Sequence, residues 1–540
     1  MRLGDFHRLR VTPGGRVRPI SECPQGVMCA SVCREAWSAI VVDPAEEQQL
    51  SETARYALIM ALTGAVALGA VLVNRLSVRL RVPAPVWMLA AAALAVQLIP
   101  GIPTPPEGAV EQAVTVALIL ILFDGGRHIG WARLRPSLVP IVVLGVFGTF
   151  LTAGGGGVLL HVGFGLAWYV ALLVATAVSP TDPAVVFSVL GRNEISGRSG
   201  TILEGESGAN DPVGIALMAG LLAAGGLNGA AFGSIAVDFV LQMAIGVAAG
   251  IGGGVALLAF MRRVSLPSEA LYPLRTLASV LLIYGATTLL HGSGFLAVFV
   301  AGIIIGHRRA PYQREIERFH AALAGLAEIV AFVGLGLTID LTVLARMDVW
   351  LPGLILGLAL AIVIRPLVVG LCLLPAQLER GERAFVMFAG LKGAVPILLG
   401  LLLLRADVPE AERLYGIVVI VVIFSVVAQG SLVAPVARRL GVPMQPVRPE
   451  PWTVAVRLQA EPDTAYQVSV AAGSVVDGRT VEEVAELVGN VWVSMVVRDG
   501  VLLPARGNTQ LRAGDLLTLL IDEDSSHEVA MFTKADGAQP

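Results

Sequence analysis

Long apolar stretches recur between about residue 55 and residue 440. An α-helix needs about 20 mostly apolar residues to cross a bilayer, so this region predicts an all-α polytopic membrane protein. The chain is 15% charged, against about 25% in soluble domains, which agrees with that prediction. Breaks at charged or Gly/Pro-rich segments divide the region into thirteen candidate spans: 55–74, 84–100, 110–126, 137–161, 166–190, 201–224, 232–260, 274–290, 293–306, 321–339, 350–374, 384–404 and 413–436.

The distribution of arginine predicts how these spans are oriented. The loops after the odd-numbered spans hold most arginines, whereas the opposite loops hold only Arg346, Arg405 and Arg413. Lys and Arg favour the cytoplasmic side of a membrane. We therefore expect an odd number of spans, with the N-terminus outside and the C-terminus in the cytoplasm of a bacterial cell, across its inner membrane.

The two polar ends of the chain are expected to differ. Residues 1–52 lack the apolar core of about 7–15 residues that a signal peptide needs. We therefore expect a disordered extension, or a start codon that was placed too far upstream. Cys23, Cys29 and Cys33 lack a fourth ligand at zinc-like spacing, so no metal site is expected there. A proline-spaced linker over 441–460 precedes a small α+β domain over 461–528 and a tail over 529–540. The strands of this α+β domain are expected at 467–470, 491–497 and 516–521, and its helix at 481–487.

Two predicted spans contain matched interruptions. Pro180 and Pro183 flank Asp182 in the fifth span, and a glycine-rich segment, 390–396, interrupts the twelfth. Proline removes an amide donor and breaks a helix, and unwound backbone at membrane depth needs protein or a cavity around it. If the seventh span is a linker, the breaks occupy the fifth element of two inverted repeats, which indicates a transporter binding site. The alternative is that both are proline kinks needed only for packing.

Ionisable residues at membrane depth are costly and therefore informative. Glu204, Ser207 and Asp211 share one face of the sixth span because they are three and four residues apart. A buried carboxylate can hold a proton or an alkali cation but not both at once, which is sufficient for exchange. Asp211 is the expected shared ligand, with Asp182 across the fifth-span break and Asn210 orienting the site.

Three further charged residues receive structural interpretations. Arg365 needs an acidic partner at membrane depth, and Glu206 is the expected one, in a structural pair. Lys392 is expected to neutralise the carbonyl groups at the helix ends of the twelfth-span break. Glu328 is either an outlying acid of the site or a residue that faces a polar interior.

Five sequence segments carry a family resemblance: Leu122–Gly126, Ser179–Val186, Glu206–Pro212, Ser293–Ala297 and Gly390–Ala394. They resemble the cation/proton antiporter family that includes prokaryotic NhaP and animal sodium/proton exchangers, most closely the potassium/proton antiporters of the NhaP type. The resemblance implies a homodimer with crossed broken helices, elevator-like alternating access, and cation contacts from Thr181, Asp182, Ser207 and Asp211. It also implies electroneutral exchange, because Asn210 precedes the aspartate. Many relatives have Arg at the position of Lys392, which leaves its role open.

Three segments of the C-terminal region carry a second resemblance: Gly478–Val481, Arg498–Gly500 and Leu511–Leu520. They resemble the C-terminal subdomain of potassium-conductance regulators, known as TrkA-C. Such domains accompany potassium transport, which favours K+ over Na+ as the substrate. Some bind small regulatory ligands, including cyclic dinucleotides; the alternative is a dimerisation module.

The sequence thus predicts a secondary antiporter that exchanges K+ for H+ across a lipid bilayer. A Na+/H+ antiporter of the same mechanism is one alternative, and a cation channel that uses the same polar residues is another. No nucleophile–base pair, metal motif or phosphate-binding loop is recognisable, so we expect a transporter and not an enzyme. We expect no cofactor and no nucleic-acid partner.

Overall fold

A computed structural model of the chain divides after Val447 into two compact units, which are described separately. The predicted N-terminal extension with its three cysteines, and most of the predicted linker and tail, lie outside the described residues. The structure describes residues 57, 60–61, 64–73, 83–98, 105–190, 193–195, 197–227, 229–307, 312–374, 376, 378–406, 408–446, 465–488, 491–498, 500–521 and 532.

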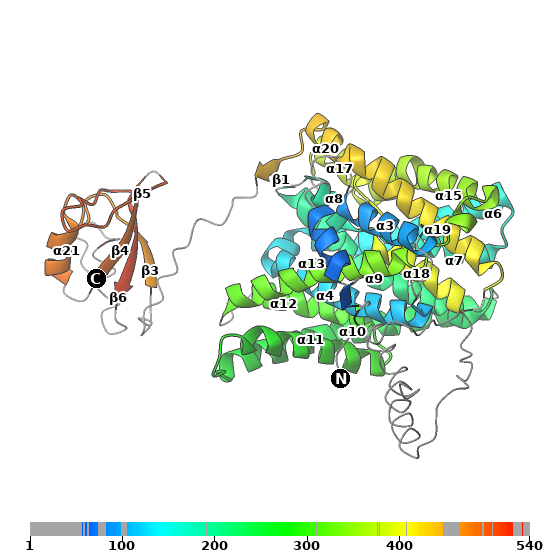
Figure 1. The fold of residues 1–540 in the computed structure, drawn as a ribbon, viewed down its shortest axis with the longest axis horizontal. Helices are drawn as coiled ribbons and strands as arrows, with labels where there is room; N and C mark the ends of the chain where they lie inside the picture. The colour runs from blue at the N-terminus through cyan, green and yellow to red at the C-terminus, as the bar shows by residue number, and fades with distance from the viewer. Residues whose placement is uncertain are drawn as a thin grey trace, which may run out of the picture. The chain divides into compact units, whose positions relative to one another are not determined.

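The first unit is a helical bundle in which the long helices run alongside one another (Figure 1). An apolar helix, Gly64–Val73, comes first in the chain. The helices before the link to the second half are α3 (Ala84–Leu98), α4 (Glu107–Leu134), η1 (Arg135–Ser137), α5 (Leu138–Val142), η2 (Val143–Gly148), α6 (Thr149–Phe164), α7 (Trp168–Ala177), α8 (Pro183–Leu190), α9 (Arg198–Ala224) and α10 (Gly229–Arg263).

The second half of this unit continues in the same way. Its helices are α11 (Leu271–Leu289), α12 (Gly294–His307), α13 (Gln313–Gly336), α14 (Leu341–Leu344), α15 (Met347–Ala359), η3 (Leu360–Ile364), α16 (Arg365–Cys372), α17 (Arg380–Phe388), α18 (Ala394–Arg405), α19 (Ala411–Phe424), η4 (Ser425–Gln429) and α20 (Gly430–Arg439).

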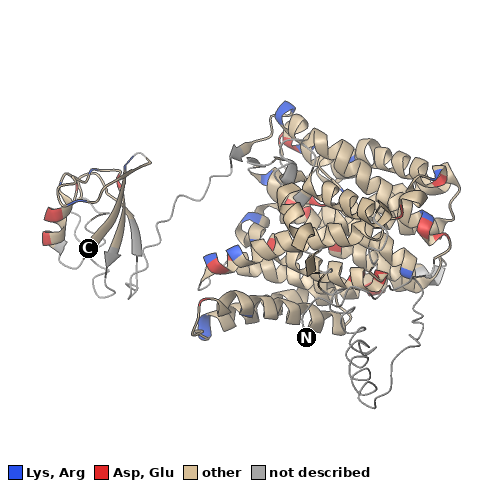
Figure 2. Cartoon of the chain, in the orientation of Figure 1, with Lys and Arg blue, Asp and Glu red and all other residues tan. Residues whose placement is uncertain are grey.

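The outer surface of the bundle is suited to lipid. Large apolar side chains such as Leu282, Ile362 and Leu371 are mostly exposed, and charged residues gather mainly near the helix ends (Figure 2). A lipid-facing helix satisfies its own backbone hydrogen bonds, which a bilayer core requires. By length and apolar composition, five helical segments among the described residues can each cross a membrane: Glu107–Phe164, Phe232–Arg263, Gln313–Gly336, Met347–Cys372 and Ala411–Arg439.

Both interruptions expected from the sequence are present. The first lies between α7 and α8, and the second between α17 and α18. Pro183 begins α8, where its missing amide hydrogen costs no helical bond. Gly393 immediately precedes α18 with non-helical backbone angles, φ −116° and ψ −141°. Each break therefore leaves free backbone groups inside the bundle.

Three predicted spans are less regular than expected. Short π-helical turns, η2, η3 and η4, lie within the spans predicted at 137–161, 350–374 and 413–436. A π-turn widens the helix and re-aims the next side chains, and such turns are frequent at functional sites. Here η3 immediately precedes Arg365 and η4 begins at Ser425.

A short strand pair was not anticipated. Strand β1 (Asn193–Ile195) follows α8, and β2 (Met444–Pro446) lies within the predicted linker. The two pair antiparallel, with Ile195 opposite Met444. Ile195 is 4% exposed and fixes the pair to the bundle. The strand pair therefore connects the segment after α8, one half of a broken span, with the first residues of the predicted linker.

The second unit is a small α+β domain. Its antiparallel sheet has the order β3-β6-β4-β5, with strands Ala465–Ser469, Leu516–Ile521, Val491–Arg498 and Val501–Leu503. Helix α21 (Val481–Val488) contributes Val484 to a core that includes Val496 and Leu517. The sequence analysis missed β5, because three residues are too few to show a strand pattern.

Candidate functional site

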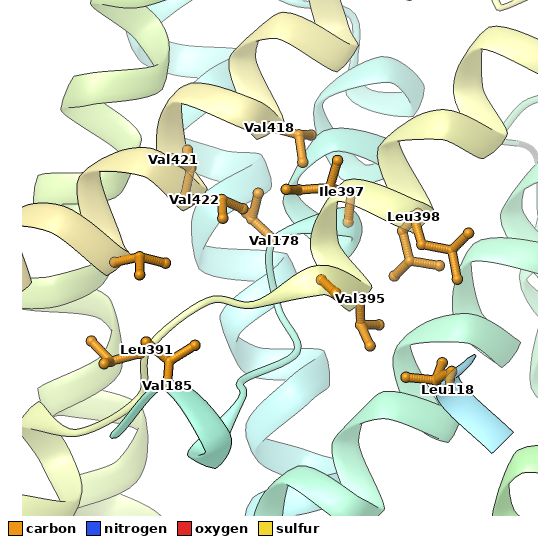
Figure 3. Packing of buried hydrophobic residues seen from close by; sticks show 14 of the residues in the cluster. Leu118, Val178, Val185, Leu391, Val395, Ile397, Leu398, Val418, Val421 and Val422 are labelled. Atoms are coloured by element: carbon orange, nitrogen blue, oxygen red, sulfur yellow. The ribbon is translucent and has the colours of Figure 1, made fainter. Parts of the chain in front are cut away.

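The two broken spans cross at the centre of the first unit. Figure 3 shows their non-helical segments passing each other, between Val178 and Val185 and between Leu391 and Val395. The backbone amide of Asp182 donates to the carbonyl oxygen of Leu391 at 2.8 Å. Since neither segment can pair within its own helix here, each supplies a backbone partner to the other.

Lys392 supplies a positive charge to this crossing. Its ammonium group donates to the carbonyl oxygens of Ser179 and Pro180 at 3.0 and 3.1 Å. The side chain is buried, with 4% of its surface exposed. These carbonyl oxygens follow the end of α7, where they have no helical amide partner. Lys392 thus bonds to carbonyl groups of the fifth-span break, whereas the sequence interpretation placed it at those of its own twelfth-span break.

Helix α9 presents polar side chains to the first break. The Ser207 hydroxyl donates to the Thr181 carbonyl oxygen at 2.5 Å. The Asn210 amide group donates to the Thr181 hydroxyl at 2.8 Å and accepts the Thr181 backbone amide at 3.3 Å. Asn210 therefore holds Thr181 through both ends of its side-chain amide, and it carries no charge itself.

Asp211 is the exception among these side chains. It is buried, with 6% exposed, and makes no hydrogen bond or ion pair within the part of the chain that the structure describes. Asp182 and Lys392 both lie close enough for their charges to act on it. A buried carboxylate in this position needs a proton or a cation to offset its desolvation.

The close approach of Asp182 to the second break depends on glycine. A Cβ atom at Gly393 would collide with the Asp182 carboxylate. The same holds at Gly390, where a Cβ would collide with the Arg365 guanidinium. The glycines of the twelfth span thus provide space for two charged side chains, in addition to breaking the helix.

Glu206 and Arg365 form a buried ion pair beside the crossing. Arg365 donates to both carboxylate oxygens of Glu206, at 2.8 and 3.0 Å, and to the carbonyl oxygen of Val386 at 3.3 Å. Both side chains are less than one-tenth exposed. The two charges satisfy each other, so this pair has little capacity left for a transported ion and links α9, α16 and α17.

Two site residues escaped the sequence analysis. The Ser425 hydroxyl accepts the Lys392 backbone amide at 3.0 Å and donates to Gln429 at 3.2 Å. Gln429 in turn donates to the carbonyl oxygen of Phe388 at 2.5 Å. Two polar residues four apart in an otherwise apolar span were the available signal, since they mark one face of a helix.

Two other acids occupy different surroundings. Glu204 shares a helical face with Asp211 but lies 3.4 Å from Arg133, an exposed residue, in a surface ion pair. Glu328 of α13 is half-buried, and its charge interacts with that of Asp182. Glu328 thus lies near the site, whereas Glu204 lies at the edge of the site. The described residues contain no group of three His, Cys, Asp or Glu side chains suited to a bound metal.

Comparison with known proteins identifies both units. Residues 64–439 match the family "Sodium/hydrogen exchanger, transmembrane", and residues 465–534 match the TrkA-C domain. The chain is 33% identical over 485 residues to the K(+)/H(+) antiporter NhaP2 of Shewanella oneidensis, covering 88% of this chain and 83% of the relative. It is 34% identical over 415 residues to the K(+)/H(+) antiporter NhaP of Alkalimonas amylolytica, covering 75% and 71%.

A sodium antiporter and a solved structure are also similar. The Na(+)/H(+) antiporter ApNhaP of Aphanothece halophytica is 28% identical over 350 residues, covering 61% of this chain and 65% of that protein. The sodium proton antiporter MjNhaP1 of Methanocaldococcus jannaschii has the same fold, with a TM-score of 0.61 at 23% identity over 71% of this chain and 99% of that one. The chain therefore belongs to the sodium/hydrogen exchanger family of membrane cation/proton antiporters, and it carries a C-terminal TrkA-C domain.

Proposed function

We propose that this antiporter exchanges K+ for H+, one for one, with the Asp211 carboxylate binding either ion in turn. One observation carries the proposal: Asp211 is buried beside two broken helices and has no partner among the described residues. The neighbouring polar groups of Thr181, Ser207 and Asn210 bond to one another, so they can orient the site while Asp211 changes its occupant.

The charges around the crossing support a one-for-one exchange. Glu206 and Arg365 neutralise each other, and Lys392 bonds to carbonyl oxygens. A proton or a monovalent cation adds the same single charge to Asp211. Because Asn210 is neutral, no second carboxylate stands next to Asp211 in the chain to bind another proton. Exchange through Asp211 alone moves no net charge. Asp182 is proposed to contribute a further oxygen ligand, with Thr181 and Ser207.

Potassium is preferred for two reasons. Two relatives, at 33% and 34% identity, are named K(+)/H(+) antiporters, and the TrkA-C domain matches residues 465–534. Sodium remains the second candidate because ApNhaP and MjNhaP1 are named as sodium antiporters. We further propose a transport domain over 53–440, a linker over 441–460, and a regulatory domain over 461–528.

The surrounding assembly follows from the same resemblance. We propose a homodimer in a bacterial inner membrane, with thirteen spans in inverted repeats and the C-terminal domain in the cytoplasm. Alternating access would then carry the crossing of α7–α8 and α17–α18 between the two faces. A small regulatory ligand at the C-terminal domain would modulate the rate.

Reconstitution tests the exchange directly. Purified protein in vesicles with an internal pH dye should alkalinise the lumen when K+ is added outside, with a rate that a clamped voltage does not change. Asp211→Asn should abolish this signal for both ions. Glu204→Gln is the matched control, because it removes a carboxylate from the same helix at a surface ion pair, and it should retain exchange.

The outcomes separate the alternatives. A response to Na+ alone would retain the mechanism and change the substrate. A cation current that flows without proton movement would favour the channel. Retained exchange in Asp211→Asn would remove Asp211 from the mechanism.

A further inference from the structure

An apolar groove lies beside the C-terminal end of α10, and its lining includes none of the residues of the transport site. It has a volume of about 620 Å³ and is lined by residues of α4, α10 and α12. Val255, Leu258 and Ile304 form part of its apolar wall, and Val255 is more than half exposed. The α10 residues that line the groove extend from Ile251 to Arg263, which is about three turns of helix.

Two arginines lie at one end of this groove. Arg262 and Arg263 occupy the last turn of α10, and both are exposed. Neither makes an ion pair with any residue that the structure describes. A second hollow shares Trp131 with the groove and adds Arg135. No acidic side chain lines either hollow, so this end of the groove carries uncompensated positive charge.

Trp131 joins the two hollows because α4 kinks next to it. Gly130 has φ 60° and ψ 160°, a conformation that lies outside the helix and is open to glycine. The kink places Trp131, 40% exposed, in the lining of both hollows. Tryptophan is enriched at the membrane–water interface, where one side of its ring is apolar and its N–H remains polar.

Another hollow, of about 610 Å³, provides a contrast. It lies around Asp340, Glu410 and Tyr415, and its lining contains acidic side chains together with arginines. The α10 groove differs from this hollow because its lining combines an apolar wall with cations and no acid. This combination matches an amphiphile that carries a negative headgroup.

We propose that the groove binds one anionic phospholipid, with its phosphate at Arg262 and Arg263 and an acyl chain along Val255, Leu258 and Ile304. Basic pockets between membrane helices bind anionic headgroups in this way. A free phosphate ion would use the arginines but leave the apolar wall bare. Since α10 packs against α9 and α12, the bound lipid stabilises the helix that follows the Asp211 helix.

A tandem arginine pair elsewhere in the chain provides a matched control. Arg438 and Arg439 also end a helix, α20, and are also exposed, but they line no part of the groove. We would measure phosphatidylglycerol retained by the full-length protein after detergent washing, using native mass spectrometry. Wild type and R438Q/R439Q should each retain one lipid, and R262Q/R263Q should bind it about 30-fold more weakly.

A second variant tests the apolar half of the site. Ala259→Phe places a ring in the groove without changing its charge, and it should displace the lipid while both arginines remain. R262K/R263K keeps the charge and should retain binding, which distinguishes lost binding from a folding defect.

Three results would overturn the proposal. Equal loss in both glutamine double variants would mean that general surface charge holds the lipid. Equal retention of phosphatidylcholine by wild type would mean that the headgroup charge is irrelevant. The third result has two parts: inorganic phosphate displaces the lipid, and the Ala259→Phe variant still retains the lipid. Together they would identify an anion site without an acyl component.

Discussion

Arg365 holds Glu206 through two parallel hydrogen bonds, 2.8 and 3.0 Å long, in the interior of the bundle. The residues are 159 positions apart and belong to α16 and α9. A bidentate arginine–carboxylate pair fixes both distance and orientation. The pair therefore holds the Asp211 helix against the half of the bundle that contains the second break.

We expect removal of either partner of this pair to be strongly destabilising. Arg365→Met or Glu206→Gln leaves one buried charge unpaired, which costs about 3–5 kcal/mol. The double variant should recover part of that loss, because no lone charge remains. Thermal unfolding in detergent measures all three, and a double variant as unstable as the sum of the singles would contradict a structural pair.

We expect the role of Lys392 in exchange to require a positive charge on a long side chain, whether that charge is an ammonium or a guanidinium group. Lys392→Ala leaves the Ser179 and Pro180 carbonyl oxygens without their partner, at about 1–3 kcal/mol, and should abolish exchange. Lys392→Arg can still donate to both and should retain a measurable rate in vesicles. An inactive but stably folded Lys392→Arg would show that the ammonium group has a role that guanidinium cannot perform.

The space at Gly393 is predicted to be essential for transport. A methyl group there would collide with the Asp182 carboxylate, so Gly393→Ala should lower exchange at least tenfold. Gly125→Ala is the control, because no atom lies within 4 Å of a Cβ at that position. Initial rates at saturating K+ should separate the two variants; similar rates would mean that Asp182 can move aside without cost.

The C-terminal unit should lose stability in acid through Asp515. Hydrogen bonds from Arg498, two of 2.8 Å, hold the pKa of Asp515 below its usual value, with help from the Arg512 backbone amide. A lowered pKa stabilises the fold above the unfolded pKa of about 3.9, and this stabilisation is lost as pH falls through the folded pKa. Protection of the β4 and β6 amides in hydrogen exchange should fall below about pH 4.

Asp515→Asn provides the check on this linkage. It should weaken the bonds to Arg498 at neutral pH and flatten the acid dependence of amide protection in β4 and β6. An acid dependence as steep as in the wild type would assign the effect to other carboxylates.

Several features of the site could be read from local chemistry. Two prolines around Asp182 and the glycines near Lys392 cannot continue a helix, so both breaks were predictable without tertiary information. Few acids lie at membrane depth, so Glu206 could be predicted as the partner of Arg365. The structure pairs the two side chains. The face shared by Ser207 and Asp211 follows from helical spacing.

Other features required the folded chain. Glu204 has the same spacing as Ser207 and Asp211, yet it turns to Arg133 at the edge of the bundle. Ser425, the first residue of a π-turn, accepts the backbone amide of Lys392, which lies 33 residues away in the chain. The pairing of Ile195 with Met444 joins segments about 250 residues apart, through strands too short to show a pattern.

Local sequence features were enough to predict that the chain crosses a membrane, where two of its spans break, and which carboxylates lie near those breaks. These properties depend on apolar length, on the absent amide of proline and on the cost of buried charge, which are all local. The packing of the helices determined that Asp211 has no partner among the described residues, that Lys392 bonds to the Ser179 and Pro180 carbonyl oxygens, and that an apolar groove ends at two arginines. Such properties arise from contacts between distant segments, whose geometry depends on how the helices pack.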